Sequence, residues 1–290
     1  MKYLLALFVG PLLFFSVHSD AVAEGASDPQ GVRVLADIPY KTGTGLSDYE
    51  KERCKLDIYL PPGRKDFATL VWFHGGGLTA GDKSGAGTVA RSLAEAGLAV
   101  VSAEYRLSPT AKYPSYIEDA AAAFAWTRAH IAEHGGNPGK LFIGGHSAGA
   151  YLALMVGLDA HYLRANAIEL SAVSGIIPIS GQTMTHLTVR EERGIGSFTI
   201  TADEAAPVYY CRKDTPPMLM LYADHDMPAR AEENAYLVAV MKAAGNEHVT
   251  GMLIRDRNHG SIASRIVDEH DPARRAILDF VASESSDKQP

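Results

Sequence analysis

Short runs of apolar and β-branched residues alternate along the chain with longer segments of helical periodicity. Runs of this kind occupy residues 70–73 and 98–102, and the segment between them, about residues 89–96, has helical spacing and stops at Gly97. Buried parallel strands consist of continuous apolar runs, and helices cover both faces of such a sheet. The alternation therefore predicts the α/β fold class, with a mostly parallel sheet of about eight strands. The other expected strands are residues 32–36, 56–60, 140–143, 175–179, 218–222 and 249–254, and the other expected helices are about residues 116–134, 150–155, 229–244 and 272–282.

Two parts of the chain depart from this alternation. The first two expected strands, residues 32–36 and 56–60, are predicted to form an antiparallel edge of the sheet. Residues 181–215 have poor periodicity, with glycines and a proline scattered among charges, and this favours a small lid or loop insertion. We find no internal repeat or linker, so residues 24–290 are expected to form one domain.

The first 23 residues have the pattern of a signal peptide. Lys2 precedes an apolar run at residues 4–15, and Ala21-Val22-Ala23 provides a small-residue cleavage site. A mature chain that starts at Glu24 and is exported, to the periplasm or outside the cell, is therefore expected. The alternative is a retained membrane anchor, but the run is shorter than the roughly 20 residues that span a bilayer. We expect no stable membrane insertion.

Composition limits the kinds of partner. The 290 residues are 47% hydrophobic and 21% charged, with a net charge of −7, which fits a globular chain without a basic surface for nucleic acid. A small-molecule partner is expected, and the oligomeric state is left open. The 2 cysteines, Cys54 and Cys211, could form one disulfide in an exported protein or remain two thiols.

A candidate nucleophile stands between an expected strand and an expected helix. Ser147 is the centre of Gly145-His146-Ser147-Ala148-Gly149, which follows the apolar run Leu141-Phe142-Ile143. An abrupt turn from strand to helix forces the serine into a strained backbone and exposes its hydroxyl, and the flanking glycines allow close contact. The N–H of Ala148 would lie at the N-terminus of the new helix, where a developing oxyanion is stabilised.

Further donors for an oxyanion are expected after the strand at residues 70–73. His74-Gly75-Gly76-Gly77 follows that strand directly, and glycines let a backbone N–H approach a bound carbonyl without obstruction. The alternative interpretation is a flexible turn. The presence of the serine turn in the same chain favours the oxyanion role for Gly76 and Gly77.

The base and the acid are predicted from chain order. When a serine nucleophile stands at a strand-to-helix turn, the order is Ser, then Asp or Glu, then His. His259 follows the last expected strand, where a loop can carry its ring over the sheet edge. Asp226 lies a few residues beyond the strand at residues 218–222 and can turn back toward His259, whereas Asp224 is the second choice. The other histidines beyond Ser147 are expected to be surface residues: His161, His186, His225, His248 and His270.

Together these motifs resemble the α/β-hydrolase fold, and in particular the hormone-sensitive-lipase-like esterases and the neighbouring carboxylesterases. The resemblance implies that Ser147 is the nucleophile, His259 the general base and Asp226 its orienting acid. It also implies an oxyanion hole made by N–H groups of Gly76, Gly77 and Ala148. The motifs, in family order, are His74-Gly75-Gly76-Gly77, Gly81-Asp82-Lys83, Tyr105-Arg106-Leu107-Ser108-Pro109, Gly145-His146-Ser147-Ala148-Gly149, Asp224-His225-Asp226 and Asn258-His259-Gly260.

The chain departs from the family pattern at two positions. Leu78 stands where an aromatic residue usually follows the glycines, which affects the expected shape of the acyl pocket. Glu104 stands where an aspartate usually precedes Tyr-Arg-Leu, and only local packing is expected to change. The resemblance further implies structural roles for Arg106 and Asp119.

The functional hypothesis is an exported serine hydrolase that cleaves small carboxylic esters through an acyl-enzyme and needs neither metal nor cofactor. An aryl formamidase or a carbohydrate acetyl esterase with the same triad is the alternative. A non-catalytic binding module that kept the fold is a further hypothesis, although such a module would be expected to have degraded motifs. A long-chain lipase would need a larger apolar lid than residues 181–215 suggest.

Overall fold

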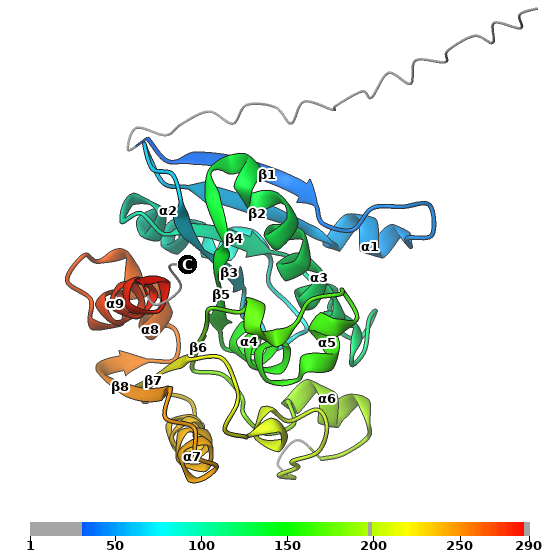
Figure 1. The fold of residues 1–290 in the computed structure, drawn as a ribbon. Coiled ribbons are helices and arrows are strands. Elements are labelled where there is room, and N and C mark those ends of the chain that lie inside the picture. Colours follow the sequence, from blue (N-terminus) through cyan, green and yellow to red (C-terminus); the bar gives the residue numbers. More distant parts are fainter. Residues whose placement is uncertain (1–30, 197–198, 287–290) are drawn as a thin grey trace, which may run out of the picture.

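The computed structural model describes residues 31–196 and 199–286, and an 8-stranded sheet forms its centre (Figure 1). The strands lie in the order β1-β2-β4-β3-β5-β6-β7-β8. Their bounds are β1 Arg33–Pro39, β2 Lys55–Leu60, β3 Phe67–Phe73, β4 Ala99–Ala103, β5 Gly136–His146, β6 Gly175–Ile179, β7 Met218–His225 and β8 Val249–Asn258.

The sheet has an antiparallel edge and a parallel centre. β2 pairs antiparallel with both β1 and β4, whereas every other neighbouring pair is parallel. Phe73 pairs with Gly145, and Gly145 pairs with Pro178, so β3, β5 and β6 end at the same level. The carboxyl ends of the parallel strands therefore meet along one edge, and the loops with the candidate site residues start there.

Helices cover both faces of the sheet, because alternate residues of each central strand point to opposite sides. Val71 of β3 packs in the core with α3, α4, α5 and α7, and Trp72 packs in a second core with α2, α8 and α9 (Figure 1). The fold expected from the apolar runs is confirmed. The helix bounds are α1 Asp48–Arg53, α2 Gly87–Glu95, α3 Ser115–His130, α4 Ala148–Leu158, α5 Ala160–Arg164, α6 Leu187–Glu192, α7 Arg230–Ala243, α8 Ser261–Ser264 and α9 Pro272–Ser286.

Element boundaries differ from the sequence expectation at the two glycines between α3 and β5. The helix expected to reach His134 ends as α3 at His130, and a 3-10 turn continues to His134. Gly135, at φ 92°, reverses the chain, and β5 begins at once because Gly136 pairs with Phe67 of β3. Among the described helices, α1, α5, α6 and α8 were not expected, since 4 to 6 residues are too few to show a helical period.

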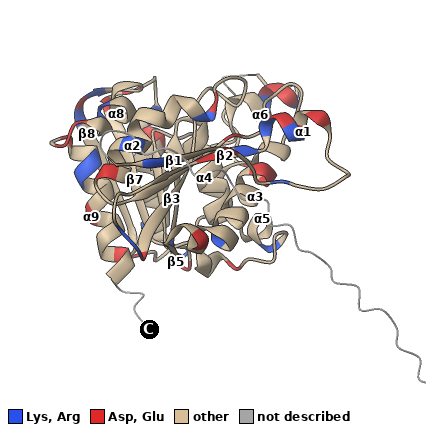
Figure 2. Ribbon diagram, turned by 90° about the horizontal axis from the view of Figure 1, so that it is seen from above, with Lys and Arg blue, Asp and Glu red and all other residues tan. Residues whose placement is uncertain are grey.

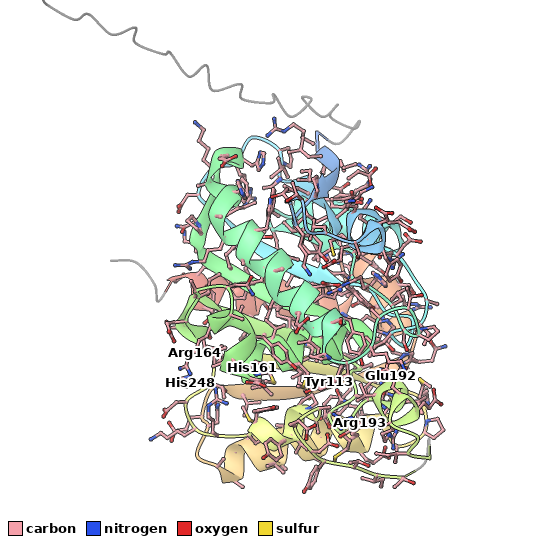
Figure 3. All side chains as sticks on the ribbon, turned by 90° about the vertical axis from the view of Figure 1, so that its right-hand side faces the viewer. Tyr113, His161, Arg164, Glu192, Arg193 and His248 are labelled. Atoms are coloured by element: carbon pink, nitrogen blue, oxygen red, sulfur yellow. The ribbon has the colours of Figure 1, made fainter. Side chains whose placement is uncertain are left out.

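Residues 181–215 connect β6 to β7 and contain α6 and a 3-10 turn at Pro207–Tyr210. Two side chains at the end of α6 anchor this segment on Tyr113 (Figure 3). Glu192 Oε2 accepts the N–H of Tyr113 at 2.9 Å, and the guanidinium of Arg193 lies 5.0 Å from the Tyr113 ring centroid. The role of this segment as a lid stays a prediction, and the expected signal peptide lies outside the described residues.

Other sequence expectations concern the surface and the cysteines. Acidic and basic residues are interspersed in the view of Figure 2. Within residues 31–196 and 199–286, no helix has both the length and the apolar character to cross a bilayer. The described residues also include no group of at least 3 His, Cys, Asp or Glu side chains that could hold a metal ion. Cys54 and Cys211 are free thiols, and burial raises the pKa of each to about 11.

A buried ion-pair network supports the turn that follows β4. The guanidinium of Arg106 binds the carboxylate of Asp119 in α3, with Nε and Nη2 each 2.7 Å from a carboxylate oxygen. The main-chain N–H of Arg106 donates to the same carboxylate. Lys41 Nζ lies 2.5 Å from Asp119 Oδ1. The Asp119 side chain is 0% exposed, so the two cations compensate a charge that has no contact with solvent.

We predict that Asp119→Ala lowers the free energy of unfolding by about 3 kcal/mol, because it removes the buried partner of Lys41 and Arg106 and leaves them only the more distant Glu50. Urea unfolding followed by circular dichroism measures this change. The matched control is Asp48→Ala, which removes an exposed carboxylate 2.9 Å from Lys51 and should cause no measurable change. Equal effects of the two substitutions would contradict the assignment.

Candidate active site

Ser147 occupies a sharp turn between β5 and α4. Its backbone, at φ 57° and ψ −119°, lies in a region of φ and ψ that residues other than glycine rarely adopt. The Ser147 N–H donates to the Ile179 carbonyl at 2.9 Å, which ties the turn to β6. A Cβ on Gly145 or Gly149 would overlap the main-chain oxygen of Phe73, so only glycine permits the close approach of the turn to β3.

The structure brings together the three residues predicted as a triad. Ser147 Oγ lies 2.9 Å from His259 Nε2, and His259 Nδ1 lies 2.6 Å from Asp226 Oδ1. Since a carboxylate only accepts, Nδ1 carries the proton, and Nε2 is free to accept from the serine hydroxyl. This is the geometry that nucleophile activation by a base requires.

The environment of Asp226 keeps it ionised. Its side chain is 1% exposed, and burial alone would raise its pKa. Hydrogen bonds from His259, from the Ser180 hydroxyl at 2.5 Å and from the Met227 N–H at 2.8 Å more than offset the burial, so the pKa is lowered from the usual value. Ser180, which follows β6, was not identified from the sequence because no motif marks it.

Asp224, the second choice for the acid, has a different position. Its carboxylate accepts the main-chain N–H of Asp256 at 2.9 Å and that of Arg257 at 3.0 Å. It therefore fixes the end of β8 just ahead of His259 and does not contact the histidine ring. Both carboxylates bind groups at or near the loop that carries His259, but only Asp226 contacts the His259 ring.

The predicted oxyanion donors flank the nucleophile. Gly76 and Gly77 have φ values of 118° and 65°, and a Cβ on the preceding Gly75 would lie 3.3 Å from the Ser147 Cβ. In the part of the chain that the structure describes, the N–H groups of Gly76 and Gly77 donate to no acceptor. Ala148 is the first residue of α4, where an N–H has no partner within the helix.

Glu104 does more than the local packing expected from the sequence. Its Oε1 lies 2.8 Å from His74 Nε2 and 2.7 Å from Arg53 Nη2, and its Oε2 accepts the Lys83 N–H at 3.2 Å. Tyr105 stacks on the His74 ring at 4.3 Å between centroids and donates to the His74 carbonyl. Glu104 thus binds residues at both ends of the glycine loop, His74 and Lys83, and this role is visible only in the tertiary contacts.

One further expectation needs correction. His186 is not a surface residue: it is 2% exposed, its Nδ1 caps α6 at the Thr188 N–H, and its ring packs on Tyr151. Burial, with nearby guanidinium groups, lowers its pKa to about 3. Leu78 is 0% exposed and packs in the core, so it fills the space beneath the loop. The other histidines expected at the surface are exposed: His161, His225, His248 and His270.

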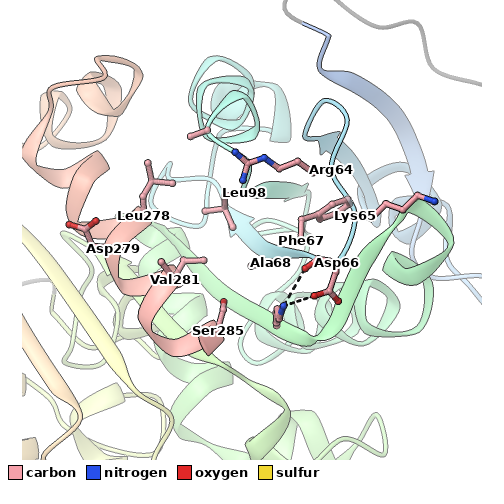
Figure 4. A pocket seen from close by; sticks show the side chains of 14 residues that line it. Arg64, Lys65, Asp66, Phe67, Ala68, Leu98, Leu278, Asp279, Val281 and Ser285 are labelled. Carbon is pink, nitrogen blue, oxygen red and sulfur yellow. Dashed lines mark hydrogen bonds and ion pairs between the residues drawn. The ribbon is translucent and has the colours of Figure 1, made fainter. Parts of the chain in front are cut away.

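One of the cavities adjoins the predicted site. It has a volume of about 360 Å³ and touches Gly75, His146 and Gly260. Another, of about 400 Å³, lies between the α6 segment and α7 and is lined by Met184, Ile200, Ala229 and Tyr236 together with Gln182, Arg190, Glu232 and Glu233. A cavity of about 480 Å³ lies at the opposite sheet edge, between the start of β3 and α9 (Figure 4).

A mostly parallel 8-stranded sheet with an antiparallel edge, and a serine turn after β5, defines the α/β-hydrolase fold. The chain belongs to the BD-FAE family, whose model matches residues 56–241. The fold and the resemblance to the esterase group inferred from the motifs are confirmed. In solved structures, the fold resembles a truncated carbohydrate esterase from gut microbiota (TM-score 0.73, 21% identity, 90% of this chain and 99% of that one). It also resembles Esterase B of Lactobacillus rhamnosus (TM-score 0.72, 17% identity, 92% and 90%).

Sequence relatives in Mycobacterium tuberculosis carry esterase names. Carboxylesterase NlhH is 33% identical over 153 residues, which cover 52% of this chain and 44% of the relative. Esterase LipQ is 27% identical over 274 residues, which cover 85% and 61% respectively. The matched parts thus span about half of those relatives' own lengths.

The lowered pKa of Asp226 predicts a specific pH dependence of stability. A carboxyl group whose pKa is lower in the folded state stabilises the fold above its unfolded pKa of about 3.9, and this contribution is lost as the pH falls through the folded value. The difference in unfolding free energy between the wild type and Asp226→Asn should therefore be constant above about pH 5 and shrink at lower pH. Denaturant titrations from pH 3 to 7 test this. A difference that grows on acidification would contradict the assignment.

Proposed function

We propose that the protein is a serine hydrolase of small carboxylic esters. The observation that carries the proposal is the pair of contacts of His259, at 2.9 Å to Ser147 Oγ and 2.6 Å to Asp226 Oδ1. The BD-FAE family membership and the esterase names of the sequence relatives support it.

The geometry supports a two-step reaction. Ser147 Oγ attacks the ester carbonyl carbon while His259 Nε2 takes the hydroxyl proton, and the N–H groups of Gly76, Gly77 and Ala148 stabilise the oxyanion. His259 then gives that proton to the leaving alkoxide, and an acyl-Ser147 remains. Water attacks the acyl group, His259 takes a proton from the water, and the collapse releases the carboxylic acid and returns the proton to Ser147.

The space next to the triad supports a small substrate. The cavity of about 360 Å³ touches Gly75, His146 and Gly260, which adjoin the glycine loop, the nucleophile and the base. A cavity of this size suits a short or medium acyl or alcohol group. A carbohydrate acetyl ester is the second candidate, because the similar solved structure described above is named a carbohydrate esterase. An aryl formamide would use the same triad.

Substrate preference tests the proposal. We expect hydrolysis of p-nitrophenyl acetate and butyrate at higher kcat/KM than decanoate, an acetylated xylo-oligosaccharide or an aryl formamide. A preference for the acetylated sugar or for the formamide would replace the simple ester as the substrate class. Absence of Ser147-dependent turnover on every compound would contradict the proposal.

Substitutions separate the two carboxylates. We predict that Ser147→Ala and Asp226→Asn each lower kcat by at least about 10³-fold, since one removes the nucleophile and the other the acceptor that orients His259. The matched control Asp224→Asn should lower kcat by no more than about tenfold, because its carboxylate accepts main-chain N–H groups near β8 and does not orient the His259 ring. A reversed ranking of the two aspartates would show that the acid is assigned wrongly.

We also propose that the chain is exported after removal of residues 1–23. The supporting observation is the charged start, the apolar run and the small residues ahead of Glu24. Expression in a bacterial host, fractionation and N-terminal sequencing should give an exported protein that begins at Glu24. A cytoplasmic product with an intact N-terminus would contradict this proposal.

A further inference from the structure

His146, the residue before the nucleophile, has no role in the reaction just described. It is the last residue of β5, where it pairs with Ile179 of β6. Its Nε2 lies 2.6 Å from the main-chain oxygen of His259, 113 residues away in the sequence. The two rings pack against each other with centroids 4.7 Å apart and planes tilted by 44°.

The direction of this hydrogen bond follows from the acceptor. A carbonyl oxygen can only accept, so His146 Nε2 must carry the proton and donate it. Burial, and next the charge that His259 acquires on protonation, lower the pKa of His146 to about 4. The ring is therefore neutral at neutral pH, with its proton on Nε2.

We propose that His146 is a positioning residue for His259: its Nε2–H holds the His259 carbonyl and thereby keeps the imidazole between Ser147 and Asp226. This inference rests on the proposed function, because it concerns the same base. Positioning of a reacting group to within a fraction of an ångström can change rates by about 10²-fold.

The bond from His146 connects the loop of His259 to β5, the strand that leads to the nucleophile. The loop's other hydrogen bonds are internal or run to elements other than β5. The N–H groups of Gly260 and Ser261 donate to Asn258 Oδ1, and the Asn258 N–H donates to Ser261 Oγ. Ahead of the loop, Asp224 accepts main-chain N–H groups at the end of β8, and Arg257 pairs with Asp271. These contacts shape the turn but do not connect it to the nucleophile strand. The bond from His146 makes that connection, since His146 and Ser147 are adjacent on β5 and its turn.

The charged and titratable groups around His146 come from several elements. Asp226 comes from the loop after β7 and Arg230 from α7, and both act on it electrostatically along with His259. His74, after β3, and Asp82, ahead of the 3-10 turn at Lys83–Ala86, line the cavity that His146 borders. α8 contributes only Ala263 and Ser264 to that cavity, neither of which titrates.

The cavity beside His146 allows a test by chemical rescue. It has a volume of about 360 Å³ and is bounded by His146, Gly75 and Gly260. His146→Ala would join the space of the lost ring to this cavity. Free imidazole could then enter and supply the missing donor to the His259 carbonyl.

The main experiment compares His146→Leu with His146→Gln. Leu removes the donor, so we expect kcat on ethyl butyrate to fall by about 10- to 100-fold with KM within twofold. The acid limb of the kcat/KM pH profile should also change, because a displaced ring loses part of its contact with Asp226. Gln keeps an amide donor at similar reach and should restore kcat to within about threefold and the pH profile to that of the wild type.

The rescue experiment uses His146→Ala with and without imidazole, followed by pH-stat titration. Imidazole should raise kcat at least about fivefold in this variant and leave the wild type unchanged. Ser147→Ala in the same imidazole gives the background. His270→Ala is the matched control, since that histidine side chain is 84% exposed and lies outside the site, and it should keep wild-type kcat.

A spectroscopic measurement separates this inference from the proposed function. The His259 Nδ1–H bonded to Asp226 should give a low-field proton resonance without any substrate. His146→Leu should shift or broaden it, and His146→Gln should preserve it. An unchanged resonance together with unchanged kcat and pH profile in His146→Leu would overturn the positioning role. If His146→Leu does not fold, the Gln variant and the imidazole rescue decide, and failure of both overturns it.

Discussion

The backbone of Ser147 is the constraint on which the rest of the site depends. A serine at φ 57° persists only when its surroundings hold it there, and several contacts do so. Gly145 and Gly149 let the turn approach the Phe73 carbonyl, and the Ile179 carbonyl fixes the Ser147 N–H. The sheet and the first turn of α4 together restrict Ser147 to this one backbone conformation. The strain thus places the hydroxyl at the sheet edge and the Ala148 N–H beside it.

The order of the parallel strands converts this local turn into a site. Neighbouring strands β5, β6, β7 and β8 end at the same edge, and each is followed by one polar residue that takes part: Ser147, Ser180, Asp226 and His259. Ser180 and His259 bind opposite oxygens of the Asp226 carboxylate, at 2.5 and 2.6 Å. Contacts across the sheet edge therefore fix the acid, the base and the nucleophile relative to one another.

The sequence was sufficient to predict the sheet and the residues that meet at Ser147, because apolar runs and short motifs encode both within a few residues. It could not identify Ser180, the hold of Glu104 on His74, or the contact of His146 with His259. Each joins residues at least 30 positions apart, and no local pattern marks them. His186 shows the same limit, since a histidine in an aperiodic segment looks exposed until α6 and Tyr151 enclose it.

The position of His259 in the chain has a consequence for biosynthesis. The base follows β8, which comes last in the chain among the described strands, and it reaches Ser147 only after β8 has paired with β7. A nascent chain can form the serine turn, the glycine loop and most of the core while its nucleophile still lacks a proton acceptor. Ser147 therefore gains the contact with His259 only once β8 lies against β7.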